Sequence, residues 1–136
     1  MSAKAFVDSN VFIYLHDTTA DAKREAARRL VDELWRSGEG ALSVQVLQEF
    51  YVNSTKKLGM PSEEAEAQMR RLSARTVHAP TPQDVLIAVQ LQRRHRLSFW
   101  DAMILTSAGR LGCGVLYSEL NADQTVAGVK IQNPFS

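Results

Sequence analysis

The fold is decided by the stretch at residues 5–15, AFVDSNVFIYL. A short apolar run stops abruptly at Asp8, two further polar residues follow, and apolar residues resume at Val11. Aspartate, serine and asparagine are favoured just before helices because their side chains accept hydrogen bonds from the first unpaired backbone N–H groups. The pattern predicts a buried strand, a polar turn and a helix, in that order.

The same alternation continues along the chain. Further strands are predicted at residues 41–44, 76–79, 114–118 and 128–131, and further helices at residues 21–36, 45–58, 61–75, 81–96 and 98–111. Short strands separated by whole helices are typical of parallel strands joined by crossover helices. We therefore expect an α/β protein with three layers, α/β/α, around a central, mainly parallel sheet of four to five strands.

Length and composition limit the class of protein. The chain has 136 residues, a formal net charge of +1 and 45% hydrophobic residues. Because this length is typical of one domain, residues 1–136 are expected to form a single domain. The near-neutral charge excludes a histone-like polyelectrolyte, but it does not exclude a local cationic groove.

Cysteine content and hydropathy indicate the environment. Cys113 is the one cysteine of the sequence, which excludes an intramolecular disulfide and a cysteine-rich zinc site. No apolar run approaches the ~20 residues of a membrane span, and the start of the chain lacks the charged region of a signal peptide. We expect a soluble, cytoplasmic protein with no membrane partner.

Three acidic residues stand where a site is expected. In open parallel sheets, ligands bind beyond the carboxyl ends of the strands. Asp8 follows the first strand, Glu49 lies in the helix after the second strand, and Asp101 stands in the first turn of a later helix. Each also has an ordinary structural explanation: an N-cap, an edge carboxylate that reaches water, and an acid that favours the helix dipole.

Acids gathered at one edge of a sheet repel one another, and a divalent cation removes that cost. Mg²⁺ prefers oxygen ligands and takes one or two carboxylates directly, with water in the other positions. Asp8 and Asp101 are the predicted direct ligands, and Glu49 would bind a second ion or orient a water. Because the sequence offers no cysteine or histidine pair, zinc is disfavoured.

Three short motifs carry a resemblance to a known family. They are FVDSNV at residues 6–11, SVQVLQEFY at residues 43–51 and LSFWDA at residues 97–102. They resemble the acidic motifs of PIN-domain ribonucleases, and in particular those of the VapC-like toxins of bacterial toxin–antitoxin pairs. The ending GVKIQNPF, residues 128–135, is similar to the end of that group.

The resemblance implies a three-layer PIN-like domain and an endoribonuclease, dependent on Mg²⁺ or Mn²⁺, that cleaves single-stranded regions of RNA. It also implies a cognate antitoxin protein as inhibitor, and a homodimer. Asp8, Glu49 and Asp101 occupy the acidic positions of the family. Ser9 and Asn10 match its polar residues after the first acid, where they would hold Asp8 in place.

The sequence departs from the family at one position. Many relatives carry a fourth acid two residues after the serine or threonine that ends the fourth strand, and here Leu120 stands there. Glu119 and Asp123 are nearby acids, and the sequence assigns neither to the site. The number of metal ions, one or two, therefore stays open.

An RNA substrate would need cations around an acidic site. The candidates are Arg93, Arg94, His95 and Arg96, then Lys56 and Lys57, then Arg70, Arg71 and Arg75. Cations late in a helix also complement its dipole, which explains the same residues without RNA. The aromatic residues that could stack a base, or else pack in the core or at a subunit contact, are Tyr14, Tyr51, Phe99 and Trp100.

Other classes of protein fit less well. A phospho-receiver domain needs an aspartate after the third strand, and a dinucleotide-binding unit needs glycines in the first turn; both are absent. His16, His78 and His95 show no pattern of a nucleophile with a base. The main alternative is a non-catalytic PIN-like module that binds RNA or protein without cleaving it.

Overall fold

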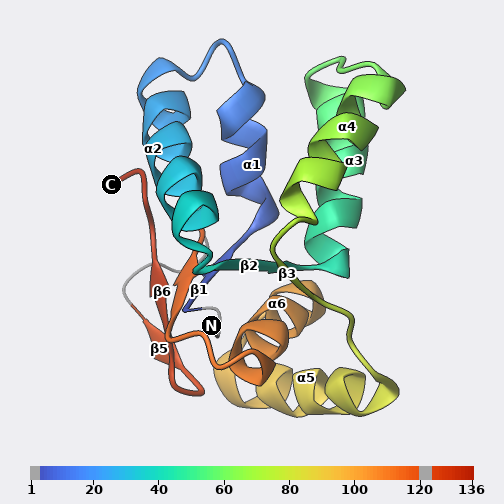
Figure 1. Cartoon of the computed structure of the whole chain (residues 1–136). Helices are drawn as coiled ribbons and strands as arrows, with labels where there is room; N and C mark the ends of the chain where they lie inside the picture. Colours follow the sequence, from blue (N-terminus) through green and yellow to red (C-terminus); the bar gives the residue numbers. More distant parts are fainter. Residues whose placement is uncertain (1–3, 120–123) are drawn as a thin grey trace.

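The structure is a computed structural model that describes residues 4–119 and 124–136. Its elements, shown in Figure 1, are β1 (Ala5–Val7), α1 (Ser9–His16), α2 (Asp21–Ser37), β2 (Gly40–Ser43), α3 (Val44–Lys57), α4 (Ser62–Leu72), β3 (Thr76–His78), α5 (Pro82–His95), α6 (Phe99–Arg110), β4 (Val115–Tyr117), β5 (Thr125–Val126) and β6 (Val129–Gln132). Among the described helices, none is both long and apolar enough to cross a membrane.

The sheet has six strands in the order β3-β2-β1-β4-β6-β5. Every described pairing is parallel except that of β5 with β6. The predicted, mainly parallel sheet is confirmed, but the prediction of four to five strands was one short. The extra strand, β5, forms a hairpin with β6 through Ala127 and Gly128, which both have positive φ. Two such residues are typical of a tight hairpin turn, and β5 is too short to show a hydropathy period.

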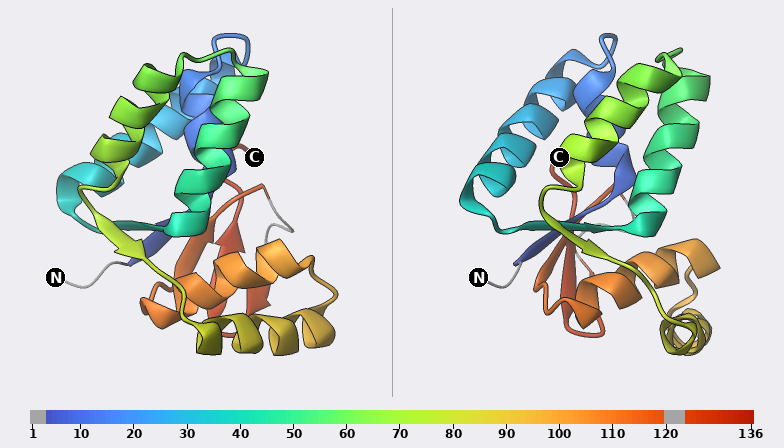
Figure 2. Two further views of the ribbon diagram at one scale, coloured as in Figure 1. Left: turned by 90° about the vertical axis from the view of Figure 1, so that its right-hand side faces the viewer. Right: turned by 45° about the vertical axis from the view of Figure 1, so that its right-hand side comes forward.

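Helices cover both faces of the sheet, as predicted. α1, α2, α3 and α4 lie on one face, and α5 and α6 lie together on the other (Figures 1 and 2). β1 lies in the middle of the sheet and all of its residues are buried. A strand covered on both faces is expected to be apolar throughout, as Ala5-Phe6-Val7 is.

Capping residues decide where the helices nearest the strand ends begin. Asp8 and Ser43 are the N-caps of α1 and α3; Asp8 directly follows β1, and Ser43 is the last residue of β2. Ser98 is the N-cap of α6, and its Oγ accepts a hydrogen bond from the Asp101 N–H at 3.1 Å. Because β1, β2 and β4 are adjacent and parallel, the residues that follow them meet at one edge of the sheet.

Candidate active site

Asp8 is the most buried of the three predicted acids, with 7% of the residue exposed. Its Oδ1 accepts a hydrogen bond from the Ser9 N–H at 2.7 Å, and its Oδ2 accepts one from the Ser118 Oγ at 2.8 Å. The Asn10 Nδ2 lies 3.5 Å from Oδ2 and 3.2 Å from the Ser118 Oγ. Neutral groups therefore orient both oxygens, and no described cation forms an ion pair with this carboxylate.

Glu49 lies beside Asp8 on α3 and is half-buried. Its Oε1 accepts a hydrogen bond from the Ser9 Oγ at 2.9 Å, and its Oε2 accepts one from the Gln45 Nε2 at 3.2 Å. Ser9 therefore links the two acids, because its backbone holds Asp8 while its hydroxyl holds Glu49. The sequence predicted the first of these contacts in outline but not the second.

Asp101 reaches the site from the opposite layer. It lies half-buried in the first turn of α6, and the Gln45 Nε2 ties the start of this helix to α3 by donating to the Trp100 carbonyl at 3.1 Å. The three predicted acids thus come from α1, α3 and α6, which are far apart in sequence.

The pKa of Asp8 depends on its burial and on the charges of the other two acids. Burial raises the pKa of Asp8 to about 6, against the hydrogen bonds from Ser118 and the Ser9 N–H, which lower it. The negative charges of Glu49 and Asp101 raise it further. The structure therefore places the carboxylates of Glu49 and Asp101 within electrostatic reach of Asp8.

The oxygen groups of the site fit a hard cation with a small number of direct protein ligands. Among the described residues, no three acids, histidines or cysteines are close enough together to hold one ion between them. Mg²⁺ needs only one or two carboxylates when water fills the other positions. The Asn10 Oδ1 is buried and has no hydrogen-bond partner among the described groups. It is a further oxygen acceptor beside Asp8, so the donor chemistry suits an ion and its water.

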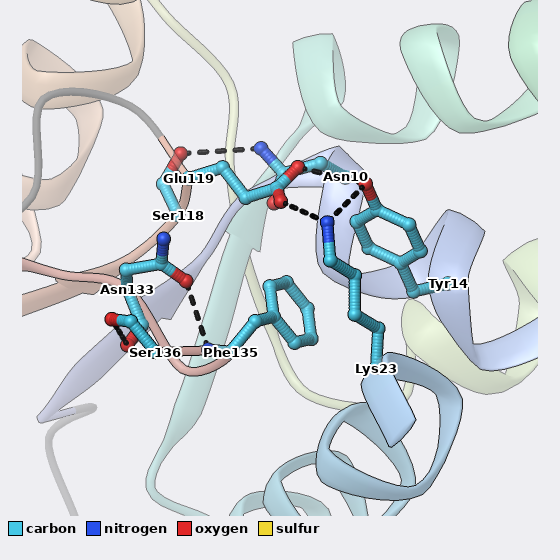
Figure 3. Close-up of polar contacts among 8 residues, drawn as sticks. All are labelled: Asn10, Tyr14, Lys23, Ser118, Glu119, Asn133, Phe135 and Ser136. Carbon is cyan, nitrogen blue, oxygen red and sulfur yellow. Dashed lines mark hydrogen bonds and ion pairs between the residues drawn. The ribbon is translucent and has the colours of Figure 1, made fainter. Parts of the chain in front are cut away.

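Glu119, the neighbour of Ser118, is held away from the acid cluster. Figure 3 shows its carboxylate beside Lys23 and Tyr14. The Tyr14 OH donates to Oε1 at 3.0 Å, and the Lys23 Nζ lies 3.0 Å from Oε2. Lys23 also donates to the Tyr14 OH at 3.2 Å. Glu119 already has a cation, whereas Asp123 and Leu120 lie outside the described residues.

Two clefts adjoin the acids. The first cleft has a volume of about 540 Å³, and its lining includes Ser9, Asn10, Tyr14, Asn53, Lys57 and Glu119. The second cleft has a volume of about 510 Å³ and is lined by Gln45, Gln48, Glu49, Val52, Asn53 and Trp100. Because Asn53 lines both, the two clefts are neighbours, with Ser9 and Glu49 between them.

The predicted RNA-binding residues divide between these clefts and the rest of the surface. Lys57 and Tyr14 line the first cleft, and Trp100 lines the second. The stretch Arg93–Arg96 is exposed at the end of α5 and lines neither cleft. Lys57 is thus the one predicted cation that the described lining of the clefts contains.

Three polar residues of the site were missed from the sequence. Ser118 ends β4, the same kind of position that singled out Asp8, so this signal was available. Gln45 precedes Glu49 by one helical turn, a spacing that brings side chains together. Lys23 had no signal, because its contact with Glu119 joins α2 to the end of β4.

One histidine has a partner that the sequence did not indicate. The His78 Nδ1 lies 2.8 Å from the Ser107 Oγ, and its Nε2 lies 3.5 Å from the Asp84 Oδ2. The order of groups resembles a serine–histidine–aspartate triad. Ser107 is 1% exposed inside α6, however, so no substrate can reach its hydroxyl. These contacts join β3, α5 and α6 and do not form a second site.

Comparison with known proteins finds one matching family. The PIN domain family matches residues 5–125 of the chain. A search of the curated proteins finds no match.

Several solved structures share the fold over nearly the whole chain. One is a toxin–antitoxin complex from Klebsiella pneumoniae, with a TM-score of 0.73 and 21% identity over 98% of this chain and 99% of that one. Another is VapC20 of Mycobacterium tuberculosis, described as a sarcin–ricin loop cleaving toxin, with a TM-score of 0.68 and 24% identity over 85% and 88%. A third is DNA-bound VapBC from Salmonella typhimurium, with a TM-score of 0.69 and 19% identity over 97% and 98%.

Proposed function

The chain belongs to the PIN domain family, and on that premise we propose that it is a metal-dependent endoribonuclease that cleaves single-stranded regions of RNA. Residues 1–136 would act as one domain. The observation that carries the proposal is the gathering of Asp8, Glu49 and Asp101 at one sheet edge, where burial and the other two charges raise the pKa of Asp8 to about 6. Carboxylates without a protein cation are suited to binding one from solution.

Asp8 and Asp101 would hold a Mg²⁺ or Mn²⁺ ion, and Glu49 would orient a water molecule beside them. A divalent ion in such a site lowers the pKa of water and neutralises charge on the phosphate. The residues of the chain supply the geometry. Ser118 and the Ser9 N–H hold the Asp8 oxygens in place, while the Ser9 hydroxyl and Gln45 hold Glu49.

The first cleft supports an RNA strand as substrate. The Lys57 ammonium can approach a phosphate there, and Tyr14 supplies an aromatic ring and a hydroxyl. The relative described as cleaving the sarcin–ricin loop suggests that exposed loops of structured RNA are the substrate class.

A toxin role is supported by a solved relative that is described as a toxin–antitoxin complex. The proposed partners are a cognate antitoxin protein and a second copy of this chain, in the cytoplasm where the RNA is found. Co-expression with the protein encoded next to this chain tests the antitoxin, and light scattering tests the dimer.

The decisive experiment incubates the full chain with a structured RNA in Mg²⁺ or in EDTA. We expect cleavage within single-stranded regions in Mg²⁺, none in EDTA, and none with Asp101→Asn in Mg²⁺. Asp32→Asn is the matched control, because Asp32 is an exposed acid of α2 that lines neither of the two clefts. Cleavage in EDTA, or by Asp101→Asn at the wild-type rate, would contradict the proposal.

The non-catalytic alternative has two observations in its favour. The described acids do not form a three-residue metal cage, and Glu119 is engaged by Lys23. A module of that kind would bind RNA equally well in Mg²⁺ and in EDTA and would leave it intact.

A further inference from the structure

Trp100 is exposed to an extent that packing does not explain. It is 61% exposed, although an indole ring is among the largest apolar groups that a protein can bury. Its position is nevertheless well defined. Gln45 holds its carbonyl at 3.1 Å, and its ring meets Phe99 edge-on with centroids 5.0 Å apart. An aromatic ring that has a defined position and is exposed to solvent is typical of a surface that binds a flat ligand.

The lining of the second cleft suits a neutral, flat group with polar edges. Trp100 and Val52 provide apolar surface, while Gln48 and Asn53 provide side-chain amides that make no hydrogen bond within the described part of the chain. Glu49 adds a carboxylate, and none of the described lining residues is a cation. A phosphate would be repelled there, whereas a nucleobase has both the flat face and the hydrogen-bonding edges that the lining matches.

The position of the second cleft also fits a nucleic acid strand. It shares Asn53 with the first cleft, whose Lys57 can approach a phosphate. The acids Glu49 and Asp101 lie at its border, since Glu49 lines it and Asp101 directly follows Trp100. A strand with its phosphates along the first cleft could place one base in the second cleft without a double-stranded partner.

From these observations we infer that the second cleft binds one unpaired base of the RNA next to the cleavage point, stacked on the Trp100 indole. The inference rests on the proposed function for the identity of the ligand. Stacking requires a base that has no pairing partner, so this cleft would select single-stranded positions. Gln48 and Asn53 would contact the edge of the base and give a preference among the four bases.

The test measures binding and not cleavage. Short single-stranded oligoribonucleotides are titrated in Mg²⁺ into the full chain carrying Asp8→Asn, which keeps the RNA intact. Adding Trp100→Ala should weaken binding by about 5- to 100-fold, the range found for a single stacked base. Trp100→Phe should keep most of the affinity. Leu86→Ala is the matched control, because Leu86 is 58% exposed on α5 and should leave affinity unchanged.

A set of oligoribonucleotides with one abasic nucleotide each makes the test specific. At one position, loss of the base should weaken binding to the Asp8→Asn protein as much as Trp100→Ala does. In the Asp8→Asn/Trp100→Ala protein, the same abasic nucleotide should cost nothing further. Equal losses at every position, or losses that add in the double variant, would overturn the inference.

Two further outcomes would also overturn it. One is unchanged oligoribonucleotide affinity in Trp100→Ala. The other is a change of molecular mass in Trp100→Ala at unchanged affinity, which would assign the exposed ring to a protein contact. Failure of the proposed function is distinguishable, because wild-type protein that never cleaves RNA can still show Trp100-dependent binding, and active protein can lack it.

Discussion

Two buried aspartates of this protein stand in opposite electrostatic situations. Asp8 at the end of β1 is 7% exposed and Asp84 in the first turn of α5 is 1% exposed. Asp8 is hydrogen-bonded by neutral groups, whereas Asp84 lies 2.7 Å from the Arg110 Nε and accepts a hydrogen bond from the Thr81 N–H at 2.9 Å. Among the residues that the structure describes, the first acid has no cation beside it, and the second has one.

Their pKa values move in opposite directions for this reason. Burial and neighbouring acids raise the pKa of Asp8 to about 6. The backbone hydrogen bond from Thr81, its hydroxyl and the charges of Arg110 and His78 lower the pKa of Asp84, against burial.

The comparison distinguishes a structural acid from a functional one. A buried carboxylate that has its own cation is already satisfied, and removal of one partner costs stability. A buried carboxylate that has only other carboxylates as charged neighbours costs stability, and it persists where an external cation is to be bound. Glu119 is partly exposed at the rim of the same site, and it too has its own cation, Lys23.

The largest expected effect is on RNA cleavage. Asp8→Asn should lower the rate by more than about 100-fold, since even residues behind the metal ligands typically matter by 10- to 100-fold. Asp84→Asn should cleave at a rate within about 3-fold of wild type when assayed well below its unfolding temperature. Initial rates on one RNA substrate check both variants. A larger loss of cleavage rate in Asp84→Asn than in Asp8→Asn would contradict the assignment of Asp8 as the functional acid and Asp84 as the structural one.

The second effect is on stability. Asp8→Asn should make the protein more stable, although it lowers the rate of cleavage. The folded pKa of Asp8, about 6, lies above its ordinary value of 3.8, so the folded state binds this proton more tightly. Stability is therefore lost as the pH rises between these values. Without divalent ions, Asp8→Asn should be more stable than wild type at pH 7, by at most about 3 kcal/mol. Urea unfolding should show the gain at pH 7 and its disappearance near pH 4.

Asp84 should behave in the opposite way. Its folded pKa is depressed, so it contributes stability above the ordinary value of 3.8, and this is lost as the pH falls through the folded pKa. Asp84→Ala removes a capping box and an ion pair with Arg110, whose side chain is half exposed. Urea unfolding at pH 7 should show a loss of about 1–2 kcal/mol. A gain there would contradict the structural role.

The smallest effect is expected at the rim. The Lys23–Glu119 pair is partly exposed, so Lys23→Met should lower the stability of the protein only slightly. The loss should shrink at about 1 M salt, because salt screens exposed charges. Thermal unfolding at low and high salt measures it, and an equal loss at both salt concentrations would show that packing on Tyr14, not charge, is what Lys23 contributes.

Local patterns predicted the parts of the site that lie close in sequence. Asp8 as a residue at a strand end and Asp101 in the first turn of a helix capped by Ser98 both follow from neighbouring residues. For Asp84, the sequence predicted a helix start but not the partner Arg110. A capping box spans three residues, whereas that ion pair depends on how α5 lies against α6.

The sequence by itself determined the order of the elements, the layered arrangement and the positions of Asp8 and Asp101 at helix starts. These follow from hydropathy periods and from capping, which act over a few residues. Tertiary structure alone decided which charges meet. It placed Glu49 and Asp101 near Asp8, paired Glu119 with Lys23, and left the Trp100 ring exposed to solvent in the cleft that Glu49 also lines. Electrostatic energy depends on distance in space and on access to water, and neither quantity is a function of separation along the chain.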